Sequence, residues 1–196
     1  MLARILLVIN MIRRRPKEAN DVASPWRRLG LKKQPLVGRL TDCMSDNAKR
    51  PSWDQYFMTI TRQVAERSTC LRAKVGAVFV RDKNILATGY NGAPAGMPHC
   101  LDVGCLIYES RTPSGDVEEN CFRCIHAEIN AIAQAAKNGA SIGDADIYIT
   151  HTPCIHCFKV LINTGIRRVL YEKPYKLPTL EELRRHSDVE LVQVPM

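Results

Sequence analysis

Residues 121–157 hold the pattern that decides the fold. The stretch opens with Cys121-Phe122-Arg123-Cys124-Ile125-His126-Ala127-Glu128 and closes, after a spacer, with His151-Thr152-Pro153-Cys154-Ile155-His156-Cys157. Its centre reads H-x-E followed by P-C-x-x-C. A catalytic zinc takes three nitrogen or sulfur ligands from the protein and leaves its fourth position to water. His126, Cys154 and Cys157 fit that count, so the sequence predicts a zinc site.

The two cysteines of P-C-x-x-C are predicted to lie at the start of a helix. Cys154 and Cys157 are three residues apart and share one face of a helix. Thr152 is the predicted N-cap and Pro153 suits the first helical position, which places both cysteines in or near the first turn. The partial positive charge of a helix N-terminus favours thiolate over thiol.

His126 and Glu128 are two positions apart in the sequence, which corresponds to roughly 200° around a helix. They cannot share a face in mid-helix, but both can reach a point beyond the helix end. We therefore expect a helix that starts at His126 and runs through Ile129, Ile132 and Ala136. In this arrangement Glu128 is not a ligand. It exchanges a proton with water on the metal, whose pKa zinc lowers to near 7.

A structural zinc ribbon is the alternative interpretation of the same stretch. The pairs Cys121-x-x-Cys124 and Cys154-x-x-Cys157 would then supply four thiolates. That interpretation leaves His126 and Glu128 without a role, so the catalytic interpretation is favoured.

The length and cysteine content indicate one domain in a reducing compartment. A chain of 196 residues holds one domain with a sizeable core. Eight cysteines are too few for a disulfide scaffold, and their grouping near His and Glu indicates metal and a cytoplasmic location. No run approaches the roughly 18 apolar residues of a membrane span. The apolar run at 5–9 precedes its arginines, the reverse of a secretory signal.

The net charge of +8 lies entirely in the N-terminal segment. Residues 1–50 contain 12 Lys and Arg against 4 Asp and Glu, whereas residues 51–196 contain 16 of each. We expect residues 1–50 to be a basic, disordered extension and residues 51–196 to be the zinc domain. Two alternatives are a translation start at Met44 and a nucleic-acid-binding arm. The neutral balance of the domain argues against a nucleic-acid partner.

The rest of the chain predicts an α/β layer architecture. A helix begins after its N-cap Ser52, carries the core stripe Trp53, Phe57, Ile60 and Val64, and ends at Cys70 and Leu71. Strands are predicted at 75–80, 85–88, 146–150, 168–171 and 189–194, and further helices at 154–163 and 179–185. Residues 97–120, rich in Gly, Pro and acidic residues, are predicted to form a long loop.

Two further features point to ligands. Within residues 51–196, five cysteines lie outside the catalytic set: Cys70, Cys100, Cys105, Cys121 and Cys124. Because structural zinc takes four ligands, a second metal would leave at least one of them spare, and the alternative is a set of reduced thiols. Asn91, in a Gly/Asn turn at a strand end, is a candidate to point its amide at a ligand.

The chain resembles the bacterial deoxycytidylate (dCMP) deaminases, in particular their competence-associated branch. The resemblance covers about residues 52–176 and is carried by C-L-R-x-x-V-G-A-V, G-Y-N-G-A-P, P-H-C, H-A-E-x-N-A-I and T-P-C-x-x-C. It implies a three-layer α/β/α fold with a five-stranded mixed sheet. It also implies zinc-dependent hydrolysis of dCMP to dUMP and ammonia, which feeds thymidylate synthesis, with Glu128 relaying the proton to the ring nitrogen and the departing ammonia.

The resemblance carries further expectations. It implies a homo-oligomer, often a hexamer, that dCTP activates and dTTP inhibits. It matches Asn91 to the sugar contact, and it makes Cys70 and Cys100 the firmest matches for a second metal. Gln134 and Lys137 depart from the pattern of some relatives, which carry an aromatic residue and an arginine near the effector site, and this departure bears on nucleotide regulation.

Two other functions compete with this one. A tRNA adenosine deaminase shares H-A-E and P-C-x-x-C, but would call for a basic face and would lack the insertion between Cys100 and Cys124. A non-catalytic zinc module is the second, and the intact Glu128 speaks against it. The residues that hold the 5′-phosphate are open among four candidates: Arg72, Lys74, Arg123 and Lys173.

Overall fold

The structure is a computed structural model that describes residues 50–111, 115, 117–175 and 177–195. The chain divides into Met1–Ala48 and Lys49–Met196, and the second unit contains the domain described below. Apart from Arg50, the predicted N-terminal extension lies outside the described residues.

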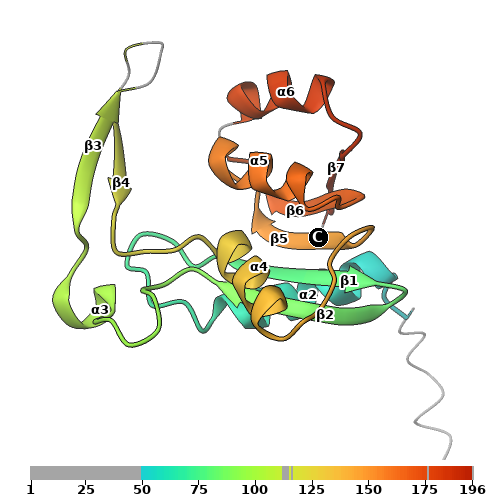
Figure 1. Cartoon of the computed structure of the whole chain (residues 1–196), viewed down its shortest axis with the longest axis horizontal. Coiled ribbons are helices and arrows are strands. Elements are labelled where there is room, and N and C mark those ends of the chain that lie inside the picture. The colour runs from blue at the N-terminus through green and yellow to red at the C-terminus, as the bar shows by residue number, and fades with distance from the viewer. Residues whose placement is uncertain (1–49, 112–114, 116, 176, 196) are drawn as a thin grey trace, which may run out of the picture. The chain divides into compact units, whose positions relative to one another are not determined.

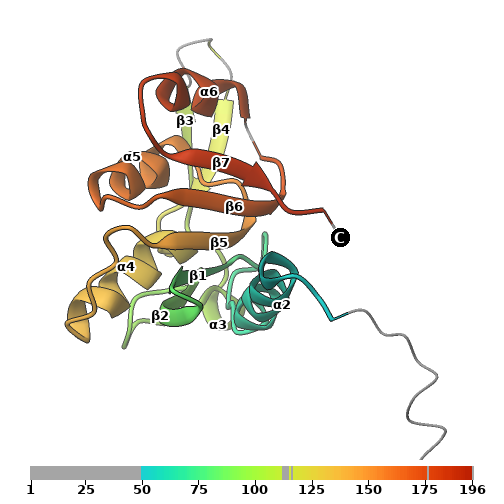
Figure 2. The ribbon, with the colours of Figure 1, turned by 90° about the vertical axis from the view of Figure 1, so that its right-hand side faces the viewer.

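A five-stranded mixed sheet forms the middle of the domain (Figures 1 and 2). Its order is β2-β1-β5-β6-β7, with bounds Asn84–Tyr90, Gly76–Arg81, Asp146–His151, Arg168–Lys173 and Glu190–Gln193. β1 pairs antiparallel with both β2 and β5, whereas β5, β6 and β7 run parallel. The five-stranded mixed sheet is as predicted.

Helices cover both faces of the sheet, which gives the expected α/β/α layers. Figure 2 shows α2 (Trp53–Ala65) on one face and α4 (Ala127–Lys137), α5 (Ile155–Asn163) and α6 (Leu177–Arg185) on the other. The sequence of β1 explains how one strand serves both layers. Ala77 and Phe79 join the core under α4 and α5, whereas Val78 and Val80 join the core under α2. This follows from the two-residue period of a strand.

Helix α2 begins after Ser52, its predicted N-cap, but it does not end where the sequence predicted. The hydroxyl of Ser52 accepts from the Gln55 N–H at 3.2 Å, and the Gln55 side chain accepts from the Ser52 N–H at 3.0 Å. The helix ends at Ala65 rather than near Cys70.

Trp53 was wrongly placed in the core, because its side chain is 45% exposed. Phe57 is buried as predicted, and Ile60 and Val64 are partly buried against the same core. The other buried residues of α2 are Met58, Thr61 and Ala65. Close packing explains why Thr61 and Ala65 are small, because a Cβ added to Gly76 of β1 would lie 2.3 Å from the Thr61 carbonyl oxygen and 2.7 Å from the Ala65 nitrogen. Helix and strand therefore approach too closely at this point for a large side chain.

The prediction of a loop over residues 97–120 is wrong. The segment contains the short helix α3 (Cys100–Val103) and the antiparallel strands β3 (Ile107–Arg111) and β4 (Val117–Cys121). Figure 1 shows this hairpin standing away from the five-stranded sheet. Turn-forming residues do occur at 112–116 (T-P-S-G-D), but Ile107, Tyr108 and Val117 on either side favour strands, and the acidic residues at 109, 118 and 119 do not prevent them.

The remaining helices and strands agree with the sequence predictions, with ends moved by one or two residues. No helix in the described part of the chain is both long and apolar enough to cross a membrane.

Candidate zinc active site

Two helix N-termini meet at the candidate zinc site. His126 is the N-cap of α4 and Cys154 is the N-cap of α5, each with extended backbone angles. The prediction that Thr152 caps α5 is wrong, since the helix begins at Ile155. The Thr152 hydroxyl instead donates to the Tyr175 carbonyl and accepts from the Tyr175 N–H, both at 2.6 Å. Thr152 therefore anchors the loop after β6.

The three predicted ligands converge in space. Nδ1 of His126 lies 3.4 Å from the sulfur of Cys154 and 3.4 Å from the sulfur of Cys157. A tetrahedral zinc with Zn–S near 2.3 Å and Zn–N near 2.0 Å holds its nitrogen and sulfur ligands about 3.5 Å apart. The spacing and chemistry of these donors therefore fit zinc. His156, between the two cysteines, is exposed and does not belong to this group.

Glu128 lies in the first turn of α4 and is 4% exposed. Burial raises the pKa of its carboxyl to about 7, from a usual value of 4.5. A carboxyl that titrates near neutral pH can both accept and release a proton under working conditions. Its position beside the three donor atoms gives the site an acid–base group as well as metal ligands.

The two thiols of the site have pKa values shifted in opposite directions. The hydrogen bond from Cys157, with a further one from His126, lowers the pKa of Cys154 to about 3. The same pairing raises the pKa of Cys157. The hydrogen bond with Cys154 in turn raises the pKa of His126. A thiolate at a helix N-terminus is the form in which cysteine binds a metal.

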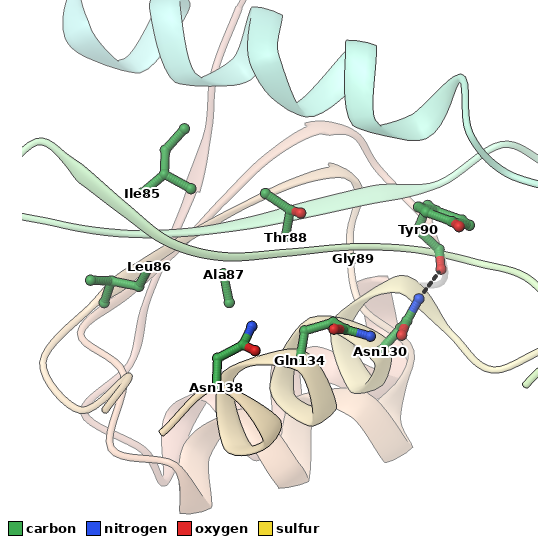
Figure 3. Close-up of a pocket in the computed structure, with 9 residues that line it drawn as sticks. All are labelled: Ile85, Leu86, Ala87, Thr88, Gly89, Tyr90, Asn130, Gln134 and Asn138. Carbon is green, nitrogen blue, oxygen red and sulfur yellow. Dashed lines mark hydrogen bonds between the residues drawn. The ribbon is translucent and has the colours of Figure 1, made fainter. Parts of the chain in front are cut away.

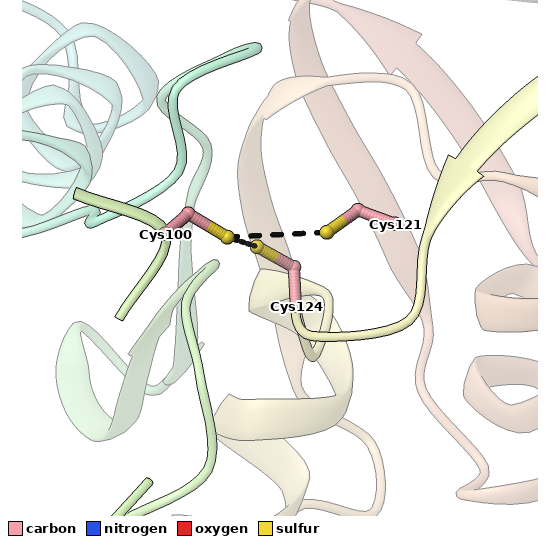
Figure 4. Close-up of side chains that lie close together, drawn as sticks. All are labelled: Cys100, Cys121 and Cys124. Carbon is pink, nitrogen blue, oxygen red and sulfur yellow. Dashed lines mark hydrogen bonds between the residues drawn. The ribbon is translucent and has the colours of Figure 1, made fainter. Parts of the chain in front are cut away.

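A second group of thiols lies in the insertion (Figure 4). The sulfur of Cys100 is 3.5 Å from that of Cys124 and 3.9 Å from that of Cys121. These values fit the S···S separation of about 3.8 Å in a tetrahedral zinc site. Cys70 and Cys105, the other predicted members, lie outside this close trio. Burial raises the pKa of the Cys124 thiol, and the neighbouring thiols of Cys100 and Cys70 raise it further.

The structure argues against a zinc ribbon. Cys121 and Cys124 belong to the group around Cys100, whereas Cys154 and Cys157 belong to the group around His126. The two C-x-x-C pairs therefore do not surround one common point.

Asn91 is buried, with 7% exposure, and its amide holds the neighbouring chain. Its Oδ1 accepts from the Ser68 hydroxyl at 2.6 Å and from the Val75 N–H at 2.8 Å, and its Nδ2 donates to the Ala73 carbonyl at 2.8 Å. Sequence reasoning missed Ser68, because a serine after a helix end carries no distinctive signal. The ligand contact of Asn91 stays a prediction.

A groove of about 480 Å³ lies between β2 and α4 (Figure 3). Asn130, Gln134 and Asn138, at four-residue intervals, line its helical side. Asn130 donates to the Tyr90 carbonyl at 2.9 Å and so ties α4 to the end of β2. This is a positioning role that the sequence analysis did not assign. Gln134 also lines this groove, and it is one of the two residues, with Lys137, at which the sequence departs from some members of the resembled family.

Known proteins resemble this chain over the same region. The family described as "Cytidine and deoxycytidylate deaminase zinc-binding region" matches residues 51–173. ComE operon protein 2 of Bacillus subtilis is 46% identical over 149 residues, covering 76% of this chain and 74% of the relative. Deoxycytidylate deaminase of Schizosaccharomyces pombe is 37% identical over 136 residues, which are 69% of this chain but 42% of that longer protein.

A solved structure agrees with these matches. The dCMP deaminase of cyanophage S-TIM5, crystallised with dCMP and dUMP, superimposes with a TM-score of 0.60 at 28% identity, covering 74% of this chain and 98% of the phage chain. The sheet order, the paired helix N-termini and these matches lead to one assignment: the chain belongs to the cytidine and deoxycytidylate deaminase zinc-binding family.

Proposed function

We propose that this protein is a zinc-dependent dCMP deaminase, which hydrolyses dCMP to dUMP and ammonia and so feeds thymidylate synthesis. The observation that carries the proposal is the buried Glu128 beside three donor atoms with zinc spacing. The phage relative crystallised with dCMP and dUMP supports the nucleotide class.

His126, Cys154 and Cys157 would hold the metal. Zinc bound there supplies a Lewis acid that lowers the pKa of water to near 7. Glu128 takes up a proton on its carboxylate, delivers it to the ring nitrogen of cytosine, and carries a second proton to the leaving amine. Its pKa of about 7 suits both directions of transfer. The reaction consumes one water and releases one ammonia, so no other reactant is needed.

The proposal includes a second, structural zinc. Cys100, Cys121 and Cys124 would supply three sulfurs, and Cys70 or Cys105 the fourth. Cys70 is close enough to raise the pKa of Cys124, and Cys105 contributes to the rise at Cys100. This metal would join α3, the end of β4 and the turn before His126. Reduced thiols without metal are the alternative.

Three further parts of the proposal concern the surroundings of the enzyme. Asn91 would contact the sugar, since it lies in the turn after β2 and its Nδ2 keeps one hydrogen beyond the bond to Ala73 within the described residues. The protein would act as a homo-oligomer, with dCTP and dTTP as its candidate effectors. The seven described cysteines are free thiols, which supports a reducing location such as the cytoplasm.

An ammonia-release assay tests the function. It compares dCMP, CMP, deoxycytidine and dCTP as substrates, each with and without dCTP or dTTP as effector, and includes a tRNA substrate. Steady release from dCMP and none from tRNA is the expected result. Release from tRNA alone would identify an adenosine deaminase instead, and release from no substrate would favour a non-catalytic zinc module.

A further inference from the structure

The proposed substrate carries a 5′-phosphate, and the structure separates the four cationic residues that could bind it. Lys74 is already paired, with its Nζ 2.6 Å from the carboxylate of Glu66. Arg72 and Lys173 are exposed, so water solvates their charges. Arg123 differs from all three, because it is not exposed.

The guanidinium of Arg123 is only partly exposed. Its Nε is buried and has no hydrogen-bond partner among the described residues. No ion pair joins Arg123 to any other residue in the described ranges. A buried donor without an acceptor is costly, and more so when the group is charged. An anion that enters from outside would satisfy this group, and a phosphate matches the geometry of a guanidinium.

Arg123 is held close to the proposed zinc site. Its backbone N–H hydrogen-bonds the sulfur of Cys121 on one side. On the other side Ile125 exchanges two backbone hydrogen bonds with Gly92, at 2.8 and 3.2 Å. His126 follows at once, so the Cα atoms of Arg123 and His126 are separated by at most about 11 Å. A ribose and its phosphate span a similar length from the reacting base.

We infer that Arg123 binds the 5′-phosphate and so makes the site select a nucleotide over a nucleoside. The inference rests on the proposed deaminase function. It assigns Arg123 the role of a specificity residue: its N–H groups donate to phosphate oxygens, while the base is held elsewhere.

The test compares two variants on two ligands that differ only in the phosphate. Arg123→Gln removes the charge and keeps a polar stem, and Arg72→Gln is the matched control on an exposed arginine. For Arg123→Gln, kcat/KM for dCMP should fall by about 10- to 100-fold, mainly through KM. Turnover of deoxycytidine should stay within about twofold of wild type. Arg72→Gln should leave both substrates unchanged.

Binding measurements make the inference independent of turnover. Calorimetry should show that Arg123→Gln weakens dUMP by the same factor and leaves deoxyuridine unchanged, with zinc content and thermal midpoint as in wild type. Arg123→Lys should recover part of the loss for dUMP. An equal loss for dUMP and deoxyuridine, or no loss for either, would overturn the inference. Ammonia release from no substrate would defeat the proposed function, and the dUMP measurement would still decide the role of Arg123.

Discussion

Two clusters of candidate metal ligands occur in the described part of the chain, and they differ in what surrounds them. The cluster of His126, Cys154 and Cys157 is built on the N-termini of two core helices and has the buried Glu128 beside it. The cluster of Cys100, Cys121 and Cys124 comes from a four-residue helix, a strand end and a turn, and its close group contains only thiols.

The comparison shows that ligand spacing alone does not assign a role. Both clusters have donor atoms spaced for tetrahedral zinc. Only the first includes a carboxyl that can move protons near neutral pH. A thiol-only site can fix the insertion against the active-site helix, but it has no acid–base group for chemistry. We therefore propose that the first cluster is catalytic and the second structural. The predictions below test that division, with one site outside both clusters as a stability reference.

The largest expected effect is the loss of turnover in Glu128→Gln. The variant keeps the ligands but not the proton carrier, so kcat should fall by about 10⁴-fold while zinc content stays at the wild-type level. Ammonia release and elemental analysis measure the two quantities. Glu182→Gln, on an exposed turn of α6, is the control and should have no effect. A Glu128→Gln rate above about a tenth of wild type would show that this residue is not the proton carrier.

The second prediction uses the number of zinc ions bound per chain to distinguish the two clusters. Protein purified without added zinc should hold close to two zinc ions per chain. Cys154→Ala should lose one of them and all activity, yet remain folded. Cys124→Ala should lose the other and show a lower thermal midpoint, because α3 and the hairpin are then no longer joined to the turn before His126. A single zinc that disappears in Cys154→Ala would contradict the structural site.

The opposite end of β5 provides a stability reference that involves neither cluster. Asp146 is buried, which by itself raises its pKa, but hydrogen bonds from Arg168 and Arg167 outweigh burial and hold the pKa below its usual value of 3.8. This contribution to folding is therefore present above pH 3.8 and is lost as the pH falls through the lower, folded-state pKa.

Asp146→Asn should accordingly lower the free energy of unfolding at pH 7 by about 1–3 kcal/mol. The difference from wild type should shrink in acid, and zinc content should not change. Chemical denaturation at several pH values measures this effect, with the exposed Asp82→Asn as control. A difference that persists unchanged well below pH 3.8 would mean that the ion pairs are not its cause.

The smallest effect is expected from shortening the chain. Both clusters lie between residues 100 and 157, within the region that matches the family. A protein that starts at Met44 should therefore fold, bind the same zinc and keep the activity of the full chain. Loss of solubility or activity in that protein would show that the basic N-terminal segment belongs to the functional unit.

The sequence by itself determined the fold class and the composition of the catalytic cluster. The spacing of His126, Glu128, Cys154 and Cys157 is local, and a helix N-terminus turns such spacing into a predictable geometry. The N-cap at Ser52 and the strand predicted at 75–80 could be read from the sequence for the same reason. These features depend on neighbours within one turn of a helix or one pair of strand positions.

Only the tertiary structure decided which cysteines gather with Cys100, that residues 107–111 and 117–121 pair as antiparallel strands, and that Nε of Arg123 is buried without a hydrogen-bond partner among the described residues. Each of these depends on segments far apart in the chain. Cys100 and Cys124 are brought together across the paired strands β3 and β4, which lie between them in the sequence. A missing counterion is a property of everything packed around a side chain, and no local pattern of residues encodes it.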